Sequence, residues 1–190
     1  MKLRIIPGNS KIGYVPSVSM LPVRDCREGV PCAKDCYAIR LMKLRPSVLR
    51  SWKANSDLWR SEPETFEREL LEFLKIYKPI FFRWFVGGDI PDQRFLDMME
   101  NVASCNKDTI FLAYTKQHLN FPPKPMQSTK FIYSRYLEES EALPKNISRW
   151  SVVLPGGVIA TDSFLCPGSC PECRYKCWKS NENITFPLKR

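Results

Sequence analysis

The sequence predicts an α/β fold, built either as an incomplete parallel (β/α) barrel of about six strands or as an open parallel sheet. Three observations lead to this expectation. Short runs of β-branched and aromatic residues recur along the chain, and helical patterns separate most of them. The length of 190 residues suits one domain with a substantial core. No repeat of roughly 20 to 50 residues and no low-complexity tract is visible.

The first half of the chain predicts one strand followed by three helices. Residues 12–21 read IGYVPSVSML, a roughly alternating run interrupted by Pro16, which fits a strand. Residues 35–60 have helical character, and Pro46 divides them into two helices because proline cannot continue a helix interior. A serine, a proline and a glutamate then form the start signature of a third helix over residues 61–77, where apolar residues recur at helical spacing.

The second half predicts several strands with shorter connections. Residues 79–92 read PIFFRWFVGGDIPD, a buried strand that ends in paired glycines and an acid, and a helix is expected over 94–104. Three more apolar runs each fit a buried parallel strand, and GVIAT fits a last one. These runs are residues 109–114, 130–134, 150–154 and 157–161. We expect the barrel domain to span residues 1–162, with the cysteine-rich residues 163–190 as a metal-binding extension packed on it.

The composition narrows the class of protein. A formal charge of +9, from 29 Lys and Arg against 20 Asp and Glu, suggests a polyanionic partner or an anionic cofactor, although a solvated basic surface explains it as well. The sequence shows no signal peptide and no run near the roughly 18 apolar residues of a membrane span, so a soluble, cytoplasmic protein with no membrane partner is expected. Eight cysteines in a reducing compartment favour metal or redox chemistry. A disulfide framework would apply only if the chain were exported.

The first cysteine group lies in the loop expected after the first strand. Residues 26–38 read CREGVPCAKDCYA, which places Cys26, Cys32 and Cys36 at C-x5-C-x3-C spacing. A structural zinc site normally uses four ligands, whereas a [4Fe-4S] cluster held by three cysteines keeps one iron free for a substrate or cofactor. The count of three therefore favours such a cluster. The adjoining Tyr37 is a candidate to shield the cluster or to contact a cofactor, although an aromatic beside a cysteine more often packs.

The second cysteine group consists of Cys166, Cys170, Cys173 and Cys177. Four thiols within twelve residues can close around one zinc ion or one second [4Fe-4S] cluster. The first three have C-x3-C-x2-C spacing, itself a common three-cysteine cluster pattern. They follow the last predicted strand, however, where no barrel remains to enclose a substrate, so we expect a supporting metal here. The lone Cys105 is expected to be a buried small hydrophobe.

The motif GGDI follows the predicted strand that begins near residue 81, at the edge where α/β folds bind ligands. Gly87 and Gly88 would let the backbone approach a ligand closely. Asp89 would accept hydrogen bonds from an amino group or from ribose hydroxyls. A simple turn explains the same three residues.

Charged side chains elsewhere offer further candidates. Arg83 and Arg135 lie within or just after predicted strands and are candidates to face a carboxylate or a phosphate. His118 is a candidate ligand or proton-transfer residue, although a single histidine in a loop is more often packed or exposed to solvent. Residues 24–53 carry eight Lys and Arg against three acids. Together with the nearby tryptophans 52 and 59, this basic segment is a candidate nucleic-acid surface, although such tryptophans usually pack in a core.

Several of these motifs together resemble a known family. They are NSK near the start, the cysteine loop ending in CYA, Asn55, the strand followed by R-x4-G-D, AYT, and a terminal C-x2-C-x3-C-W. From Asn9 to Trp178 this layout resembles the phage and plasmid family called gene product 88. That family is similar in turn to radical S-adenosylmethionine enzymes.

The resemblance implies a radical-SAM-like partial barrel, with a three-cysteine cluster after the first strand and a glycine-rich acidic motif after the second. It implies that Cys26, Cys32 and Cys36 hold a [4Fe-4S] cluster whose free iron chelates the amino and carboxylate groups of S-adenosylmethionine. Residues 87–89 would then meet the amino group of the cofactor. The chain departs from the usual C-x3-C-x2-C loop, and Asp89 replaces the commoner glutamate.

The function predicted from these features is that of a small phage-encoded radical SAM enzyme. It would use an electron donor to cleave S-adenosylmethionine reductively and would abstract hydrogen from an unknown substrate. The alternative is a noncatalytic protein, stabilised by zinc or an iron-sulfur cluster, that binds nucleic acid or a host protein through a basic face. A third possibility is a protein that keeps the cluster and the barrel but acts by binding a partner, for example a component of the host, without catalysis.

Overall fold

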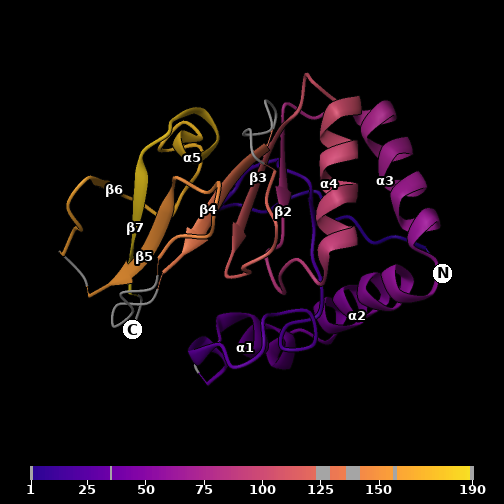
Figure 1. Ribbon diagram of the computed structural model, residues 1–190, viewed down its shortest axis with the longest axis horizontal. Coiled ribbons are helices and arrows are strands. Elements are labelled where there is room, and N and C mark those ends of the chain that lie inside the picture. Colours follow the sequence, from indigo (N-terminus) through magenta and orange to yellow (C-terminus); the bar gives the residue numbers. More distant parts are fainter. Residues whose placement is uncertain (1, 35, 123–128, 136–141, 156–157, 189–190) are drawn as a thin grey trace.

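The computed structural model describes residues 2–34, 36–122, 129–135, 142–155 and 158–188 (Figure 1). A seven-stranded sheet with the order β1-β2-β3-β4-β5-β7-β6 forms its centre, and every pair of neighbouring strands is parallel. In the described residues the sheet runs from β1 at one edge to β6 at the other without closing. The strands are β1 Ser17–Val18, β2 Phe81–Trp84, β3 Ile110–Thr115, β4 Thr129–Ser134, β5 Trp150–Leu154, β6 Ser163–Leu165 and β7 Asn183–Pro187.

Helices cover one face of the sheet and the end toward which the strands point. Figure 1 shows α3 and α4 side by side next to β2, and α1 and α2 across the carboxyl end of the strands. The short α5 packs on the opposite face through Trp178. The helices are η1 Pro31–Ala33 (a 3-10 turn), α1 Tyr37–Leu44, α2 Pro46–Ser61, α3 Pro63–Tyr77, α4 Gln93–Cys105 and α5 Lys176–Lys179. Within the described ranges, no helix combines the length and apolar character needed to cross a membrane.

Local sequence explains where these helices begin and end. Pro46 and Pro63 occupy the first positions of α2 and α3, where a missing N–H leaves no helical bond unmade. The carboxylate of Asp92 caps α4 by accepting a hydrogen bond from the backbone amide of Phe95 (2.8 Å). Lys78 ends α3 in the left-handed conformation, with φ +41°.

The larger hydrophobic core lies between the sheet and the helices α2, α3 and α4. The rings of Trp59, Phe66 and Phe95 meet edge to face, with centroids 4.7 to 5.7 Å apart. Trp84 of β2 and Phe111 of β3 stack beneath them, and all five side chains are buried. Each buried side chain of this size contributes roughly 1.5 to 3 kcal/mol to the free energy of folding.

A smaller core covers the opposite face of the sheet. Leu112 and Ile132 point to this face because successive side chains of a strand alternate between the two faces. Trp178 covers them, and its indole N–H donates a hydrogen bond to the carbonyl oxygen of Phe82 (3.3 Å). The segment that carries the second cysteine group therefore packs against early strands of the sheet.

The structure confirms the α/β class, the parallel sheet and the existence of the predicted helices up to α4. The predicted start of the third helix at Ser61 is wrong, because Ser61 is the last residue of α2 and α3 begins at Pro63. The structure also corrects the ends of the sheet. β1 comprises only Ser17–Val18 instead of most of residues 12–21. Gly13 turns the chain with φ +69°, and Pro16 has no N–H for a strand ladder.

The last predicted strand is also wrong over the described residues 158–161, which form no strand; residue 157 lies outside the described residues. β6 begins instead at Ser163, and β7, which the sequence did not predict, inserts between β5 and β6. The sheet therefore has seven strands instead of about six. The short NITFP segment becomes a strand because it has a partner on each side.

Candidate functional site

The first cysteine group lies in the loop between β1 and α1, at the carboxyl end of the sheet. Cys26, Cys32 and Cys36 are half-buried, and none of them forms a disulfide. Burial raises the pKa of the Cys26 thiol to about 12, with Asp89, Cys32 and Cys36 also acting to raise it. The three thiols therefore lie close enough to interact electrostatically. A metal that binds them must displace their protons.

The buried carboxylate of Asp25 fixes the start of this loop. One carboxylate oxygen accepts hydrogen bonds from the backbone amide of Leu21 (3.0 Å) and the hydroxyl of Ser56 (2.5 Å), and the other pairs with Arg60 (2.5 Å). The backbone carbonyl of Asp25 accepts a hydrogen bond from the amide of Asp89 (3.1 Å). This last bond holds the cysteine loop against the loop that follows β2. Sequence reasoning missed Asp25, whose only signal was an acid directly before the first cysteine.

Asn55 of α2 supports the same end of β1 and the N-terminal segment beside it. It is fully buried, and its amide group donates to the backbone carbonyls of Arg4 (2.9 Å) and Ser19 (3.0 Å). Its side-chain oxygen accepts a hydrogen bond from the backbone amide of Arg4 (2.7 Å). Asn55 therefore ties the N-terminal segment and the end of β1 to α2.

Close packing requires glycine at both positions of the paired-glycine motif. A Cβ atom on Gly87 would overlap the ring of Trp52, and one on Gly88 would lie 2.6 Å from the carbonyl oxygen of Met20. Gly88 also has φ +72°, which other residues adopt only with strain. The two glycines thus seat this loop against α2 and the end of β1. Their identity is explained without a bound ligand.

Asp89 joins the loops that follow β2 and β3. Its carboxylate accepts hydrogen bonds from the backbone amides of Ile90 (2.8 Å) and Lys116 (2.7 Å), and the side chain of Thr115 adds a further one. Burial raises the pKa of Asp89 to about 6. A hydrogen bond between this carboxylate and a cofactor stays a prediction.

Tyr37 opens α1 beside the three thiols. The residue as a whole is 59 % exposed, whereas its hydroxyl is buried and donates a hydrogen bond to the carbonyl oxygen of Val86, in the loop after β2. Burial of the hydroxyl raises its pKa, and the positive charge of Arg83 acts in the opposite direction. Tyr37 thus forms one side of the cysteine loop and leaves a ring face open to solvent.

Arg83 lies between the two cysteine groups. It pairs in register with Ser17, and its guanidinium carbon lies 5.5 Å from the centre of the Tyr114 ring. Its charge acts on Tyr37 beside the first group and on Cys170 in the second. Its Nε is buried without a hydrogen bond, and no residue in the described ranges forms an ion pair with it. Arg83 is half-buried, and partial burial of a cation without an anionic partner is unfavourable, so this position suits a nearby negative charge.

The second cysteine group lies on the smaller core, and not behind the last strand as the sequence suggested. Cys166, Cys170 and Cys173 are half-buried, and Cys177 is buried against the hydroxyl of Tyr114. Burial and the neighbouring thiols raise the pKa of Cys170 to about 12 and that of Cys177 to about 11, although the bond from Tyr114 lowers the latter. Sequence reasoning gave Tyr114 no role.

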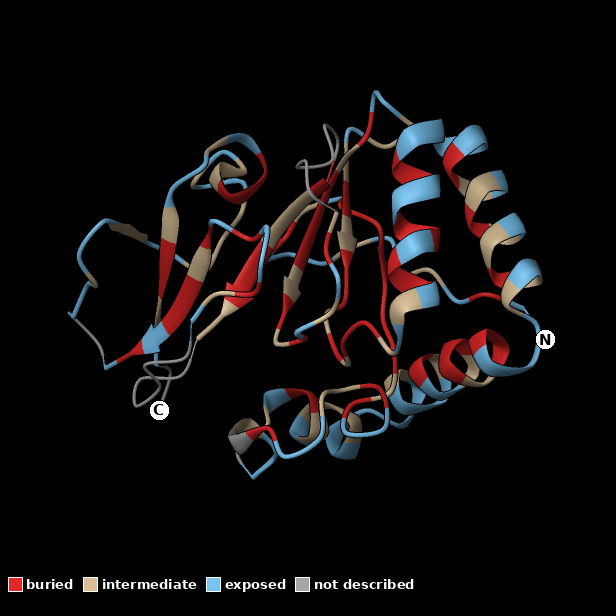
Figure 2. Ribbon diagram, viewed as in Figure 1, coloured by how far each residue is buried: buried red, intermediate tan, exposed pale blue. Residues whose placement is uncertain are grey.

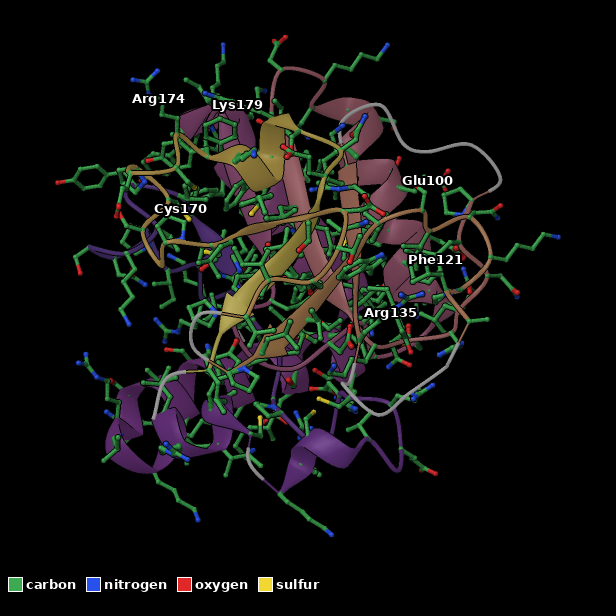
Figure 3. All side chains as sticks on the ribbon, turned by 90° about the vertical axis from the view of Figure 1, so that its left-hand side faces the viewer. Glu100, Phe121, Arg135, Cys170, Arg174 and Lys179 are labelled. Carbon is green, nitrogen blue, oxygen red and sulfur yellow. The ribbon has the colours of Figure 1, made fainter. Side chains whose placement is uncertain are left out.

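Contacts with the first strands hold this segment in place. The backbone amide of Cys170 donates to the carbonyl oxygen of Lys11 (2.7 Å), and the ring of Tyr175 stacks on Phe81 with centroids 4.8 Å apart. In Figure 3, Cys170 lies on the same side of the molecule as Arg174 and Lys179, which belong to the same folded segment. The second group therefore sits over the first half of the sheet.

A comparison with known protein families shows to which family the chain belongs. A family model described as Gene product 88 matches residues 6–135, more than half of the sequence. The chain belongs to the gene product 88 family. The match includes the first cysteine group, Arg83 and residues 87–89, and it ends before the second cysteine group. No curated protein and no solved structure is significantly similar to the chain.

In this gene product 88 protein, the thiols of each cysteine group lie in one segment of the fold, but their side chains do not surround a common point. Among the described residues, no three or more His, Cys, Asp or Glu side chains are close enough together to hold a metal ion. Their chemistry does fit a metal, because thiols are the donors that zinc and iron-sulfur clusters prefer. The unpaired cation of Arg83 also fits the negative charge that metal-bound thiolates carry. Loading would require the side chains of each group to turn toward a common point.

Other predicted site residues lie elsewhere. His118 bonds the hydroxyl of Tyr133 (2.7 Å), a residue of the larger core, and the guanidinium of Arg135 lies 5.3 Å from the ring centre of Trp150. Cys105 is exposed at the end of α4, so its prediction as a buried residue is wrong. These contacts give His118 and Arg135 packing roles.

Proposed function

We propose that Cys26, Cys32 and Cys36 hold a [4Fe-4S] cluster by three of its irons, and that the protein is a small radical SAM enzyme with a radical-SAM-like partial barrel. The observation that carries this proposal is the backbone hydrogen bond between Asp25 and Asp89 (3.1 Å). It holds a three-thiol loop against the loop of the neighbouring strand, at the carboxyl edge of a parallel sheet. Ligands of open parallel α/β folds bind at that edge.

The residues around the loop have distinct roles in this proposal. When bound and reduced by an external one-electron donor, such a cluster would supply the electron that cleaves S-adenosylmethionine to methionine and a 5′-deoxyadenosyl radical, which takes hydrogen from a substrate. The three thiolates would hold three irons, and the amino and carboxylate groups of the cofactor would bind at the fourth. Residues 87–89 would face its amino group, and Tyr37, whose hydroxyl bonds the carbonyl oxygen of Val86, would shield the cluster. Arg83 balances the negative charge of the thiolates.

We propose a structural role for the second cysteine group. Cys166, Cys170, Cys173 and Cys177 would hold one zinc ion or a second [4Fe-4S] cluster. The packing of this segment on the smaller core supports that role, because Cys177 is buried there with Trp178. A metal at this position would fasten the segment to the early strands of the sheet.

Anaerobic reconstitution with iron and sulfide tests the catalytic proposal. We expect brown protein with at least about four irons per chain, a change in the electron paramagnetic resonance spectrum of the reduced protein on adding S-adenosylmethionine, and formation of 5′-deoxyadenosine. Cys36→Ser should lose the spectral change and the product. Cys105→Ser is the matched control and should keep both, because Cys105 is exposed and distant from the loop in sequence. A fully loaded protein that never cleaves the cofactor would overturn the enzymatic proposal.

One observation favours the second candidate function, a noncatalytic protein stabilised by metal. Gly87 and Gly88 are explained by packing against Trp52 and Met20, so the loop needs no ligand to account for its sequence. This candidate predicts zinc in both cysteine groups and a colourless preparation. Metal analysis of protein purified without oxygen separates the two functions.

A further inference from the structure

α1, its C-terminal Arg45 and the first turns of α2 carry four exposed cations. Arg40, Lys43, Arg45 and Arg50 are all exposed, and we call them the basic face. Residues 36–56 contain no Asp or Glu. None of the four cations forms an ion pair with any residue that the structure describes.

Two described acids near these helices neutralise other cations. Asp57 accepts hydrogen bonds from Arg24 (2.7 Å) and Lys53 (2.6 Å), and buried Asp25 pairs with Arg60 (2.5 Å). The charge of the basic face is therefore not compensated within the neighbouring helices. Like charges that are close together repel, so this surface gains from an external polyanion.

Exposed apolar and aromatic groups accompany these charges. Tyr37 is 59 % exposed and Leu44 is 74 % exposed, and Ala38 is the buried residue of α1. Figure 2 shows exposed stretches on the side of α1 and α2 that faces away from the sheet. Trp52 and Trp59 are buried in the core, which leaves Tyr37 as the aromatic side chain next to the basic face.

We propose that the basic face and Tyr37 bind single-stranded nucleic acid. Its phosphates offer several negative charges to cations that have no ion pair in the described residues, and an unstacked base can lie on the exposed Tyr37. An acidic protein or an anionic membrane would use the charges but has no need of the ring. Because Tyr37 directly follows Cys36, the bound strand passes beside the three-cysteine loop. The contacts come from helix side chains, so binding requires no particular metal in that loop.

Fluorescence anisotropy with labelled single-stranded DNA and RNA of about 20 nucleotides tests this interface. Four phosphate contacts predict that the binding constant falls about 50-fold as salt rises from about 50 to about 200 mM. Replacing all four cations of the basic face with Gln should remove most of this salt dependence. Tyr37→Leu should weaken binding about tenfold, through the lost stacking surface.

A matched control removes the same net charge elsewhere. Lys75, Lys78, Lys145 and Arg174 are exposed and lie outside α1 and α2, and their combined change to Gln should leave the salt dependence intact. Circular dichroism checks folding, and the pairs Arg40/Lys43 and Arg45/Arg50 should each remove about half of the salt dependence. Equal loss in the control set would overturn the proposal. Binding to anionic vesicles or acidic peptides with none to oligonucleotides would also overturn it.

Discussion

The two cysteine groups lie in the same chain but in opposite surroundings. The first occupies a loop whose position depends on polar contacts, chiefly the carboxylate of Asp25 and the backbone bond from Asp25 to Asp89. The second lies on an apolar core, where Trp178 is 2 % exposed and Tyr175 stacks on Phe81. Hydrogen bonds position the first group, whereas hydrophobic packing together with the backbone bond from Cys170 to Lys11 positions the second. Replacing a single thiol should therefore cost less folding free energy in the first group than replacing buried Cys177 in the second.

Removal of Trp178 is the strongest test of the packed region. Trp178→Ala should lower the free energy of unfolding by about 3 to 5 kcal/mol, because it leaves a large cavity over Leu112 and Ile132. Urea denaturation followed by circular dichroism measures the change. Tyr14→Ala is the control, since Tyr14 is 98 % exposed, and should change stability by less than about 0.5 kcal/mol. A loss below about 1 kcal/mol for Trp178→Ala would mean that this segment does not depend on packing.

The polar region should respond most to pH, through Asp89. Burial raises the pKa of this carboxyl from 3.8 to about 6, so the folded protein holds the proton more tightly than the unfolded chain does. The stability that this provides is complete below pH 3.8 and is lost as pH rises through about 6. Between about pH 4 and 7 the wild type should lose roughly 2 to 3 kcal/mol more than Asp89→Asn, as measured by urea denaturation across that range. Parallel pH profiles for the two proteins would contradict the prediction.

Asp25→Asn tests the anchor of the first loop. The substitution removes the charge that pairs with Arg60 and weakens the bonds from Leu21 and Ser56, so it should lower the free energy of unfolding by about 2 kcal/mol. Thermal unfolding at neutral pH provides the measurement. Asp162→Asn changes an exposed carboxylate and serves as the matched control, with an expected change within about 0.5 kcal/mol. Equal effects of the two substitutions would show that the anchor contributes nothing.

Arg83→Met tests both cysteine groups at once, because the charge of Arg83 acts on residues of each. In metal-free protein the substitution removes a half-buried charge that has no ion pair among the described residues, so stability should rise by up to about 1 kcal/mol. In metal-loaded protein the gain should vanish or reverse, because the anionic thiolates then lose their counter-charge. Unfolding midpoints of both proteins, each with and without metal, reveal the difference. An identical gain in both states would show that Arg83 has no role toward a metal.

The smallest effect is expected from single thiols of the first loop. Cys36→Ser should change the stability of metal-free protein by less than about 0.5 kcal/mol, as should exposed Cys105→Ser. Cys177→Ser should lower stability by about 1 kcal/mol, because it places a more polar group in the buried site. Denaturation curves of the three variants measured together give the ranking. A Cys36→Ser loss as large as that of Cys177→Ser would remove the distinction between the two groups.

Sequence patterns predicted the parts of the fold that depend on local order. The helical spacing of residues 61–77 and the apolar runs of β3, β4 and β5 are local signals, and the structure has these elements. β1 and β7 depend on partners far away in the chain. A two-residue strand such as Ser17–Val18 is defined by its pairing with Arg83 and Trp84, which no local pattern reveals.

The same distinction between local and long-range signals applies to the residues of the candidate site. The proximity of the cysteine loop to residues 87–89 follows from a parallel pair, since the ends of β1 and β2 meet at one edge of the sheet. The location of the second group does not follow from spacing. It depends on long-range contacts such as the bond between Cys170 and Lys11. The need for Gly87 was equally hidden, because it comes from the ring of Trp52 on another element.

The position of β7 between β5 and β6 constrains the order of folding. β6 pairs with β7 alone in the described sheet, yet Ser163–Leu165 precedes Asn183–Pro187 in the chain. β6 can therefore join the sheet only after β7 has paired with β5. A released fragment that stops at residue 180 would leave one edge of β5 open, and such an unpaired edge is a template for aggregation.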